Sequence, residues 1–149
     1  MIYTENTKKA LKLCFEAHKE QKDKSGLPYV FHPFHLAEQM EDEESTVVAL
    51  LHDVAEDTDH TLEDIAAMGF SRNVTEALAL LTHDETVPYM EYVKALRNNP
   101  IARRVKLADL RHNSDLHRLN ADQIDEKALA RVKKYAEAIR LLEGEEHQG

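Results

Sequence analysis

The 149-residue sequence predicts an all-α protein, a compact single-domain helical bundle of about seven or eight helices. Three observations favour this class. Apolar residues recur at steps of three and four along most of the chain, as they do on the buried face of a helix. Glycine and proline number only four each, and they fall between the periodic segments. No segment shows the alternation of apolar and polar residues that is typical of a half-buried strand.

The first half of the chain contains four expected helices. The first follows Thr4, and the second has Pro33 in its first turn, a position that proline suits. The third is expected over roughly 43–57, where an apolar run ends in charged residues. The fourth opens with the capping-box sequence at 61–64, in which aspartate replaces glutamate, and Gly69 ends it.

The second half predicts four more helices. Pro88 and Pro100 each mark a first helical turn. The helix before Pro88 has an apolar stripe at Val74, Ala77, Leu78 and Leu81. The last helix, roughly 125–142, has one at Leu129, Val132, Ala136, Ile139 and Leu142. The single domain is expected to span 1–149 with its core at about 4–142, and the polar tail 143–149 is expected to fray.

Composition restricts the partners and the compartment. A net charge of −9 argues against binding to nucleic acid, although a local basic pocket can still take a small anion. Cys14 is the only cysteine, and the sequence begins without the basic and apolar regions of a secretion signal. No apolar run reaches membrane-spanning length. We therefore expect a cytoplasmic protein with neither a membrane nor a nucleic-acid partner.

The stretch ALLHDVAEDT at 49–58 is the most informative part of the sequence. His52 and Glu56 are four residues apart, as are Asp53 and Asp57, so each pair shares one face of a helix. Four ionisable groups thus crowd at the end of an apolar segment, where buried charge is costly unless it is paired or metal-bound. One interpretation is an internal salt bridge at a buried helix end. The other is a divalent cation, since three carboxylates so close together repel one another.

Further ligands lie elsewhere in the chain. His32 stands before Pro33 at the expected start of a helix, and Asp109 interrupts an apolar run. Asn113 follows Asp109 by four residues and shares its face. Two histidines with two carboxylates suit manganese, iron or zinc, whereas the absence of a thiolate lowers the case for a structural zinc site.

The order of His32, His52-Asp53 and Asp109 resembles the HD superfamily of metal-dependent phosphohydrolases. A narrower resemblance, to the hydrolase domain of RelA/SpoT-type alarmone enzymes, covers most of residues 10–116. Its motifs are Ala17-His18 with Gln21, KSGLPYVFHP at 24–33, LLHDVAEDT at 50–58, TLEDI at 61–65, VKLAD at 105–109 and HN at 112–113. This resemblance implies an HD-type bundle that removes pyrophosphate from the 3′ position of guanosine tetra- or pentaphosphate, as in the stringent response.

The resemblance also implies roles for single residues. Manganese is the expected metal, with Fe²⁺ and Zn²⁺ as alternatives. Its ligands would be His32, His52, Asp53 and Asp109. Glu56 and Asp57 would be catalytic, because they match the acidic pair that orients or deprotonates the attacking water.

Substrate contacts are expected from four residues. Lys24 and Ser25 match the loop that contacts the guanine nucleotide, and Asn113 would shape the nucleotide pocket. Lys106 lies three residues before Asp109 and so roughly on its side of the helix, which makes it a candidate phosphate contact. Lys22, Arg103, Arg104 and Arg111 are weaker candidates, since each alone is typical of a solvated surface charge.

Some positions depart from the family pattern. Asp23 stands where a basic residue is usual, Glu20 replaces a glycine, Leu110-Arg111 inverts the usual order, and Asp115 replaces a common basic residue. We expect these changes to affect substrate contacts more than metal ligands. Two other functions therefore stay open: hydrolysis of another nucleoside phosphate or pyrophosphate, and metal and nucleotide sensing without turnover. The Glu56-Asp57 pair favours catalysis over sensing.

A second His-Asp pair at 83–84 has no following acidic turn, which indicates a surface or capping role.

Overall fold

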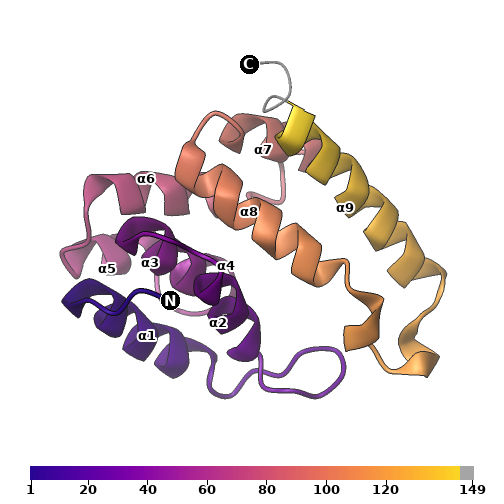
Figure 1. The fold of residues 1–149 in the computed structure, drawn as a ribbon, viewed down its shortest axis with the longest axis horizontal. Coiled ribbons are helices and arrows are strands. Elements are labelled where there is room, and N and C mark those ends of the chain that lie inside the picture. The colour runs from indigo at the N-terminus through magenta and orange to yellow at the C-terminus, as the bar shows by residue number, and fades with distance from the viewer. Residues whose placement is uncertain (145–149) are drawn as a thin grey trace.

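Residues 1–144, the part of the chain that the computed structural model describes, fold into helices and their connections (Figure 1). In chain order the helices are α1 (Glu5–His18), α2 (Phe31–Glu38), α3 (Glu43–Leu51), α4 (Val54–Asp57), α5 (Leu62–Ala67), α6 (Arg72–Leu81), α7 (Tyr89–Leu96), α8 (Pro100–Asn113) and α9 (Glu126–Gly144), with the 3₁₀ turns η1 (Leu116–Arg118) and η2 (Ala121–Gln123) before α9. No strand longer than an isolated bridge occurs in this range. The all-α class is confirmed; α4 is a single turn, and the other eight helices match the expected number.

Side chains at the helix ends explain where several helices begin. The Thr4 hydroxyl accepts a hydrogen bond from the backbone of Thr7 and caps α1. Thr61 and Asp64 form the expected capping box of α5. After α5 the chain turns at Gly69, whose φ of +90° is open to glycine at little cost. Pro100 occupies the first turn of α8.

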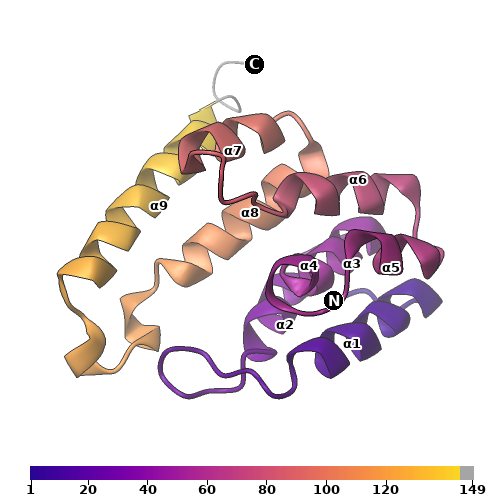
Figure 2. The same ribbon diagram turned by 180° about the vertical axis from the view of Figure 1, so that it is seen from behind.

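Helix α3 forms the inner element of the bundle. Each of its residues from Ser45 to Leu51 is buried, and it packs against α1, α2, α6 and α8. Because α8 touches α3 on one side and α9 on the other, it lies between α9 and the group formed by α1 to α6, as both views show (Figures 1 and 2). This arrangement brings the end of α3 close to α2 and α8, the helices that carry His32 and Asp109.

The single helix expected over 43–57 is wrong, because the backbone breaks after Leu51. Asp53 has φ −104° and ψ 0°, outside the helical range, and α4 restarts at Val54. Two side-chain contacts hold this break. The His52 ring turns back to the carbonyl of Ala49 at 2.7 Å, and the Asp53 carboxylate accepts a hydrogen bond from the Tyr29 hydroxyl.

The stripe expected on the last helix is also partly wrong. Leu142 is buried as expected, but Leu129 is 52% exposed, and the other buried residues of α9 in the described chain are Ala128 and Ala138. Apolar residues occur on two adjacent faces of this helix, and packing against α7 and α8 selects the face that carries the small alanines. Glu143 and Gly144 continue the helix rather than fray, and the rest of the expected frayed tail, 145–149, lies outside the described residues. Among helices in the described range, none is long and apolar enough to cross a membrane.

Burial predicts a large difference between two leucine truncations. Leu50 is fully buried in α3, so Leu50→Ala should lower the free energy of unfolding by about 2–5 kcal/mol. Leu129→Ala, on the exposed side of α9, should change it by less than about 0.5 kcal/mol. Urea denaturation of both variants measures the two effects, and similar losses would contradict the assignment of the inner helix.

Candidate active site

Three buried side chains from separate helices converge at the centre of the molecule. His32 lies on α2, His52 follows α3, and Asp109 lies on α8; their ligand atoms are all within 4.8 Å of one another. Nε2 of His32 is 2.9 Å from Oδ1 of Asp109, and Nε2 of His52 is 3.5 Å from the same oxygen. Asp53 joins the group, with Oδ2 at 3.0 Å from Nε2 of His52. The fold thus brings together the four residues that the sequence indicated as metal ligands.

The protonation of His52 follows from its surroundings. A carbonyl can only accept, so the 2.7 Å contact with Ala49 places the proton on Nδ1. In the neutral ring, Nε2 then carries a lone pair, and this buried atom has no hydrogen-bond partner among the described residues. Burial opposes a charged ring, yet the carboxylates of Asp53 and Asp109 raise the pKa of His52 well above its usual value.

A lone pair and two carboxylates that face one point repel one another unless something positive lies between them. A proton on Nε2 is one solution, and a divalent cation is the other. Imidazole nitrogen with carboxylate oxygen is a donor set that suits manganese, iron and zinc. The residues of this centre therefore fit a metal ion.

Asp109 is held ionised by its neighbours. Lys106 Nζ lies 2.9 Å from Oδ2, and Asn113 donates to Oδ1 at 3.0 Å. Although burial alone would raise its pKa, the Lys106 ammonium, the hydrogen bond with His32 and the nearby His52 imidazole hold the pKa of Asp109 well below its usual range. Lys106 was expected to contact substrate, but its mostly buried ammonium is bound to Asp109.

His112 supports His32 from behind, a role that sequence reasoning missed. The two Nδ1 atoms are 2.7 Å apart, so one ring donates to the other, and the planes of the two rings are nearly parallel, at 3°. Burial and the nearby cation of Arg118 lower the pKa of His112 to about 4. His112 is therefore neutral at pH 7, so it can hold the His32 ring in place without adding charge.

The expected catalytic pair occupies α4 at the exposed edge of the centre. The Glu56 carboxylate accepts a hydrogen bond from the backbone N–H of His83. Gln21 donates to the backbone carbonyl of Asp57 at 2.8 Å and thereby ties α4 to the end of α1. Partial burial and the charge of Asp53 raise the pKa of both Glu56 and Asp57, which makes each a stronger proton acceptor.

His83 has a role that differs from the surface or capping role expected for it. Besides donating its backbone N–H to Glu56, it stacks its ring on Tyr92 at 4.4 Å. Its neighbour Asp84 accepts from Thr86 and stabilises the loop before α7. The backbone N–H of His83 therefore positions Glu56, whereas Asp84 has the exposed capping role that was expected.

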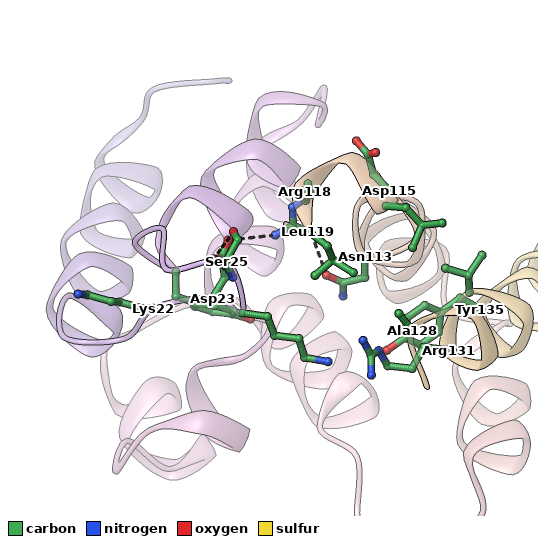
Figure 3. A pocket seen from close by; sticks show the side chains of 14 residues that line it. Lys22, Asp23, Ser25, Asn113, Asp115, Arg118, Leu119, Ala128, Arg131 and Tyr135 are labelled. Carbon is green, nitrogen blue, oxygen red and sulfur yellow. Dashed lines mark hydrogen bonds and ion pairs between the residues drawn. The ribbon is translucent and has the colours of Figure 1, made fainter. Parts of the chain in front are cut away.

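A pocket of about 350 Å³ adjoins the centre (Figure 3). Its walls come from the loop between α1 and α2, the end of α8 with η1, and α9. Lys24, Ser25 and Asn113 line it as expected, whereas Lys106 does not appear among its lining residues in the described chain. Tyr29 and Asn113 line the pocket and also hydrogen-bond Asp53 and Asp109, so they join the pocket to the centre.

The pocket is basic although the whole chain is acidic. Lys22, Lys24, Arg118 and Arg131 give four positive charges against two negative charges from Asp23 and Asp115. Sequence reasoning missed Arg118 and Arg131, because their motifs carry no local signal and only the fold brings α9 and η1 to the loop. The balance of charge favours an anionic ligand.

The positions that depart from the family pattern fall into two groups. Asp23 and Asp115 line the pocket. Within the described chain, Glu20, Leu110 and Arg111 do not, so the expectation that these three affect substrate contacts is not supported by the structure. Leu110 is buried in the core, and Arg111 pairs with Glu143 on the surface.

Comparison with known proteins places this chain in a family. No protein-family model matches it. A guanosine-3′,5′-bis(diphosphate) 3′-pyrophosphohydrolase, MESH1 of Mus musculus, is 33% identical in an alignment that covers 90% of this chain and 84% of that protein. MESH1 of Homo sapiens is also 33% identical, with 88% of this chain and 81% of that protein covered. A bacterial relative of the same description, from Aquifex aeolicus, is 33% identical over 72% of this chain but only 17% of its own length.

A solved structure described as "A metazoan ortholog of SpoT hydrolyzes ppGpp and plays a role in starvation responses" shares the fold. It has a TM-score of 0.75 at 24% identity, and the match covers 95% of this chain and 87% of the other. Fold and site together define a helical hydrolase domain. The chain belongs to the family of guanosine-3′,5′-bis(diphosphate) 3′-pyrophosphohydrolases.

The Lys106–Asp109 pair predicts a large stability effect in metal-free buffer. Lys106→Met leaves the buried Asp109 without its cation and should lower the free energy of unfolding by about 3–5 kcal/mol. Lys94→Met removes an exposed partner of Glu91 and should cost less than about 1 kcal/mol. Because folding lowers the pKa of Asp109, the ionised carboxylate stabilises the wild type at pH values above the pKa that Asp109 has in the unfolded chain. The gap between wild type and Lys106→Met should therefore shrink below about pH 4. Equal losses from both lysines would contradict this role.

Proposed function

We propose that the protein is a metal-dependent phosphohydrolase that removes pyrophosphate from the 3′ position of guanosine 3′,5′-bis(diphosphate). One observation carries this function: the buried lone pair of His52 and the carboxylates of Asp53 and Asp109 face one point beside a basic pocket. Relatives that align with most of the chain bear the name of this activity. We take residues 4–142 as one HD-type hydrolase domain.

His32, His52, Asp53 and Asp109 would hold the metal, with manganese as the first choice and Fe²⁺ or Zn²⁺ as alternatives. The donors are nitrogen and oxygen, and the one thiol, Cys14, is buried within the core cluster. When bound, the cation would act as a Lewis acid toward the phosphate and lower the pKa of water. Lys106 and His112 would fix the ligands from outside and keep Asp109 ionised.

Glu56 and Asp57 would accept the proton of the attacking water. Both lie at the exposed edge of the centre, and the raised pKa of each brings its proton affinity closer to that of a base working near neutral pH. The hydrogen bond from His83 fixes Glu56, and Gln21 fixes the turn that carries Asp57. Orientation of the water and acceptance of its proton thus fall to the same turn.

The basic pocket would bind the nucleoside and its remaining phosphates. Lys24 and Ser25 approach from the loop, and Asn113 approaches from α8 beside Asp109. The small volume suits a single nucleotide rather than a nucleic acid, in keeping with the net charge of −9. A lone buried thiol suits a reducing compartment, and we propose that the enzyme acts in the cytoplasm.

A second substrate class has one observation in its favour. Asp23 and Asp115 place two carboxylates in the pocket at positions where the family pattern has basic residues. Repulsion from these groups would weaken binding of the most highly charged nucleotides. Another nucleoside phosphate or pyrophosphate is therefore the alternative substrate.

Purified protein with Mn²⁺ should release pyrophosphate from guanosine tetraphosphate. Asp53→Ala should abolish the release, because it removes one carboxylate from the centre. A coupled pyrophosphate assay over a panel of nucleotides measures both. Cleavage of another nucleotide with the tetraphosphate left intact would establish the second substrate class. Binding across the panel without turnover would show a sensor and refute the enzymatic function.

Glu56→Gln should separate catalysis from metal binding. The amide keeps an acceptor for the His83 N–H but cannot take a proton, so kcat should fall by about 10²- to 10⁴-fold. Manganese affinity, measured by calorimetry, should change little, because the Glu56 carboxylate bonds to the His83 N–H and not to any of the four proposed ligands. Glu63→Gln on the exposed side of α5 is the matched control and should keep full activity. An unchanged kcat in Glu56→Gln would rule out its role as the base.

A further inference from the structure

A carboxylate stands in the wall of a pocket that otherwise attracts anions. Oδ1 of Asp23 accepts hydrogen bonds from the backbone of Ser25 at 3.0 Å, from its hydroxyl at 2.8 Å and from the backbone of Leu27 at 3.0 Å. These bonds shape the loop between α1 and α2, and they help to hold the pKa of Asp23 below its usual value despite partial burial. Asp23 is therefore a fixed negative charge at this wall.

Arg118 lies beside Asp23, where η1 meets the loop between α1 and α2. One guanidinium nitrogen lies 3.9 Å from Oδ2 of Asp23, and another donates to the carbonyl of His112 at 3.0 Å and to the side-chain oxygen of Asn113 at 3.2 Å. The dashed lines in Figure 3 follow this bridge from the loop to the end of α8. The Arg118 side chain is only 25% exposed, so the bridge holds a guanidinium in one place at the rim of the pocket.

The bridge leaves part of the Arg118 guanidinium available to a ligand. Asp23 on the loop and Arg118 in η1 place a negative and a positive charge side by side in the lining of the pocket. Arginine has five N–H donors in a planar fork, and the contacts with His112 and Asn113 engage one of its nitrogens. Its other donors can bind a phosphate, a geometry for which arginine is well suited.

We propose, on the basis of the proposed function, that Arg118 is a specificity-determining residue. The substrate carries one pyrophosphate that is cleaved and a second phosphate group that stays on the nucleoside, and Arg118 binds this second group. Asp23 limits the strength of that contact by competing for the same guanidinium. The nucleotide selected is one with a second anionic group beyond the scissile pyrophosphate. Arg118 is not one of the four residues that would hold the metal and reaches Asp109 only through Asn113, so it acts on binding rather than on the reacting atoms.

Two substitutions distinguish this role from a structural one. Arg118→Gln and Asp23→Asn both break the same ion pair, and Asp23→Asn keeps an oxygen for Ser25 and Leu27. If the pair only held the loop, both variants would shift KM in the same direction. If Arg118 binds substrate, Arg118→Gln loses a phosphate contact, whereas Asp23→Asn frees the guanidinium, so the shifts are opposite.

The test compares two substrates that both carry a 3′-diphosphate on guanosine. The first also carries a 5′-diphosphate, and the second has a free 5′-hydroxyl in its place. With Mn²⁺ and the 5′-diphosphate, Arg118→Gln should raise KM by about tenfold or more, and Asp23→Asn should lower it severalfold. Both variants should keep kcat, and both should keep the KM for the 5′-hydroxyl compound, within about twofold. Arg72→Gln, which removes an 89% exposed charge on α6, is the matched control and should change neither.

The role of Arg118 would be overturned if KM shifted equally for the two substrates, or in the same direction for the two variants. The proposed function would still stand in that case, provided that the wild type turns the substrate over. If Arg118→Gln fails to fold by circular dichroism, Arg118→Lys decides, since it keeps the charge but loses the fork and should raise KM for the 5′-diphosphate only. If the wild type cleaves neither substrate, the proposed function falls. Calorimetric titration with guanosine tetraphosphate then tests Arg118 by the same opposite shifts in Kd.

Discussion

The hydrogen bond from Nδ1 of His52 to the carbonyl of Ala49 is the constraint on which the site depends. It fixes both the ring and its tautomer, and it directs the lone pair of Nε2 at Asp53 and Asp109. This contact is possible because α3 ends at Leu51 and the chain leaves the helical path at Asp53. A continuous helix would carry these side chains past the centre, so the break in the backbone is what creates the site.

The rest of the fold supplies the side chains that surround Nε2 of His52. α2 brings His32 and α8 brings Asp109, and both helices pack against α3. Burial makes each uncompensated charge costly, and Lys106 offsets the charge of Asp109 from within the same helix. The exposed turn α4 then places two carboxylates with raised pKa values beside the centre, and the basic pocket lies next to it through Tyr29 and Asn113. In the proposed function, metal binding, proton transfer and nucleotide binding would thus come from three neighbouring regions.

Local signals in the sequence were sufficient for most of the fold, whereas the proposed ligand set also needed the family resemblance, because no local signal showed that His32 and Asp109 converge on His52. Thr4 and Pro100 marked helix starts, and Asp109 was visible as an acid within an apolar run. The break at Asp53 was not predictable, because apolar periodicity continues up to it and the contact that holds it comes from Tyr29, 24 residues away. Leu129 was misplaced because two faces of its helix are apolar. Arg118 carried no local signal, since only the packing of η1 against the α1–α2 loop places it beside Asp23.

Anomalous diffraction at the manganese absorption edge, from crystals grown with Mn²⁺, tests the central claim most directly. The expected result is a peak bound by the imidazoles of His32 and His52 and the carboxylates of Asp53 and Asp109, with the His52–Ala49 hydrogen bond retained. A peak at another position, or a His52 ring turned so that Nε2 meets the Ala49 carbonyl, would contradict it.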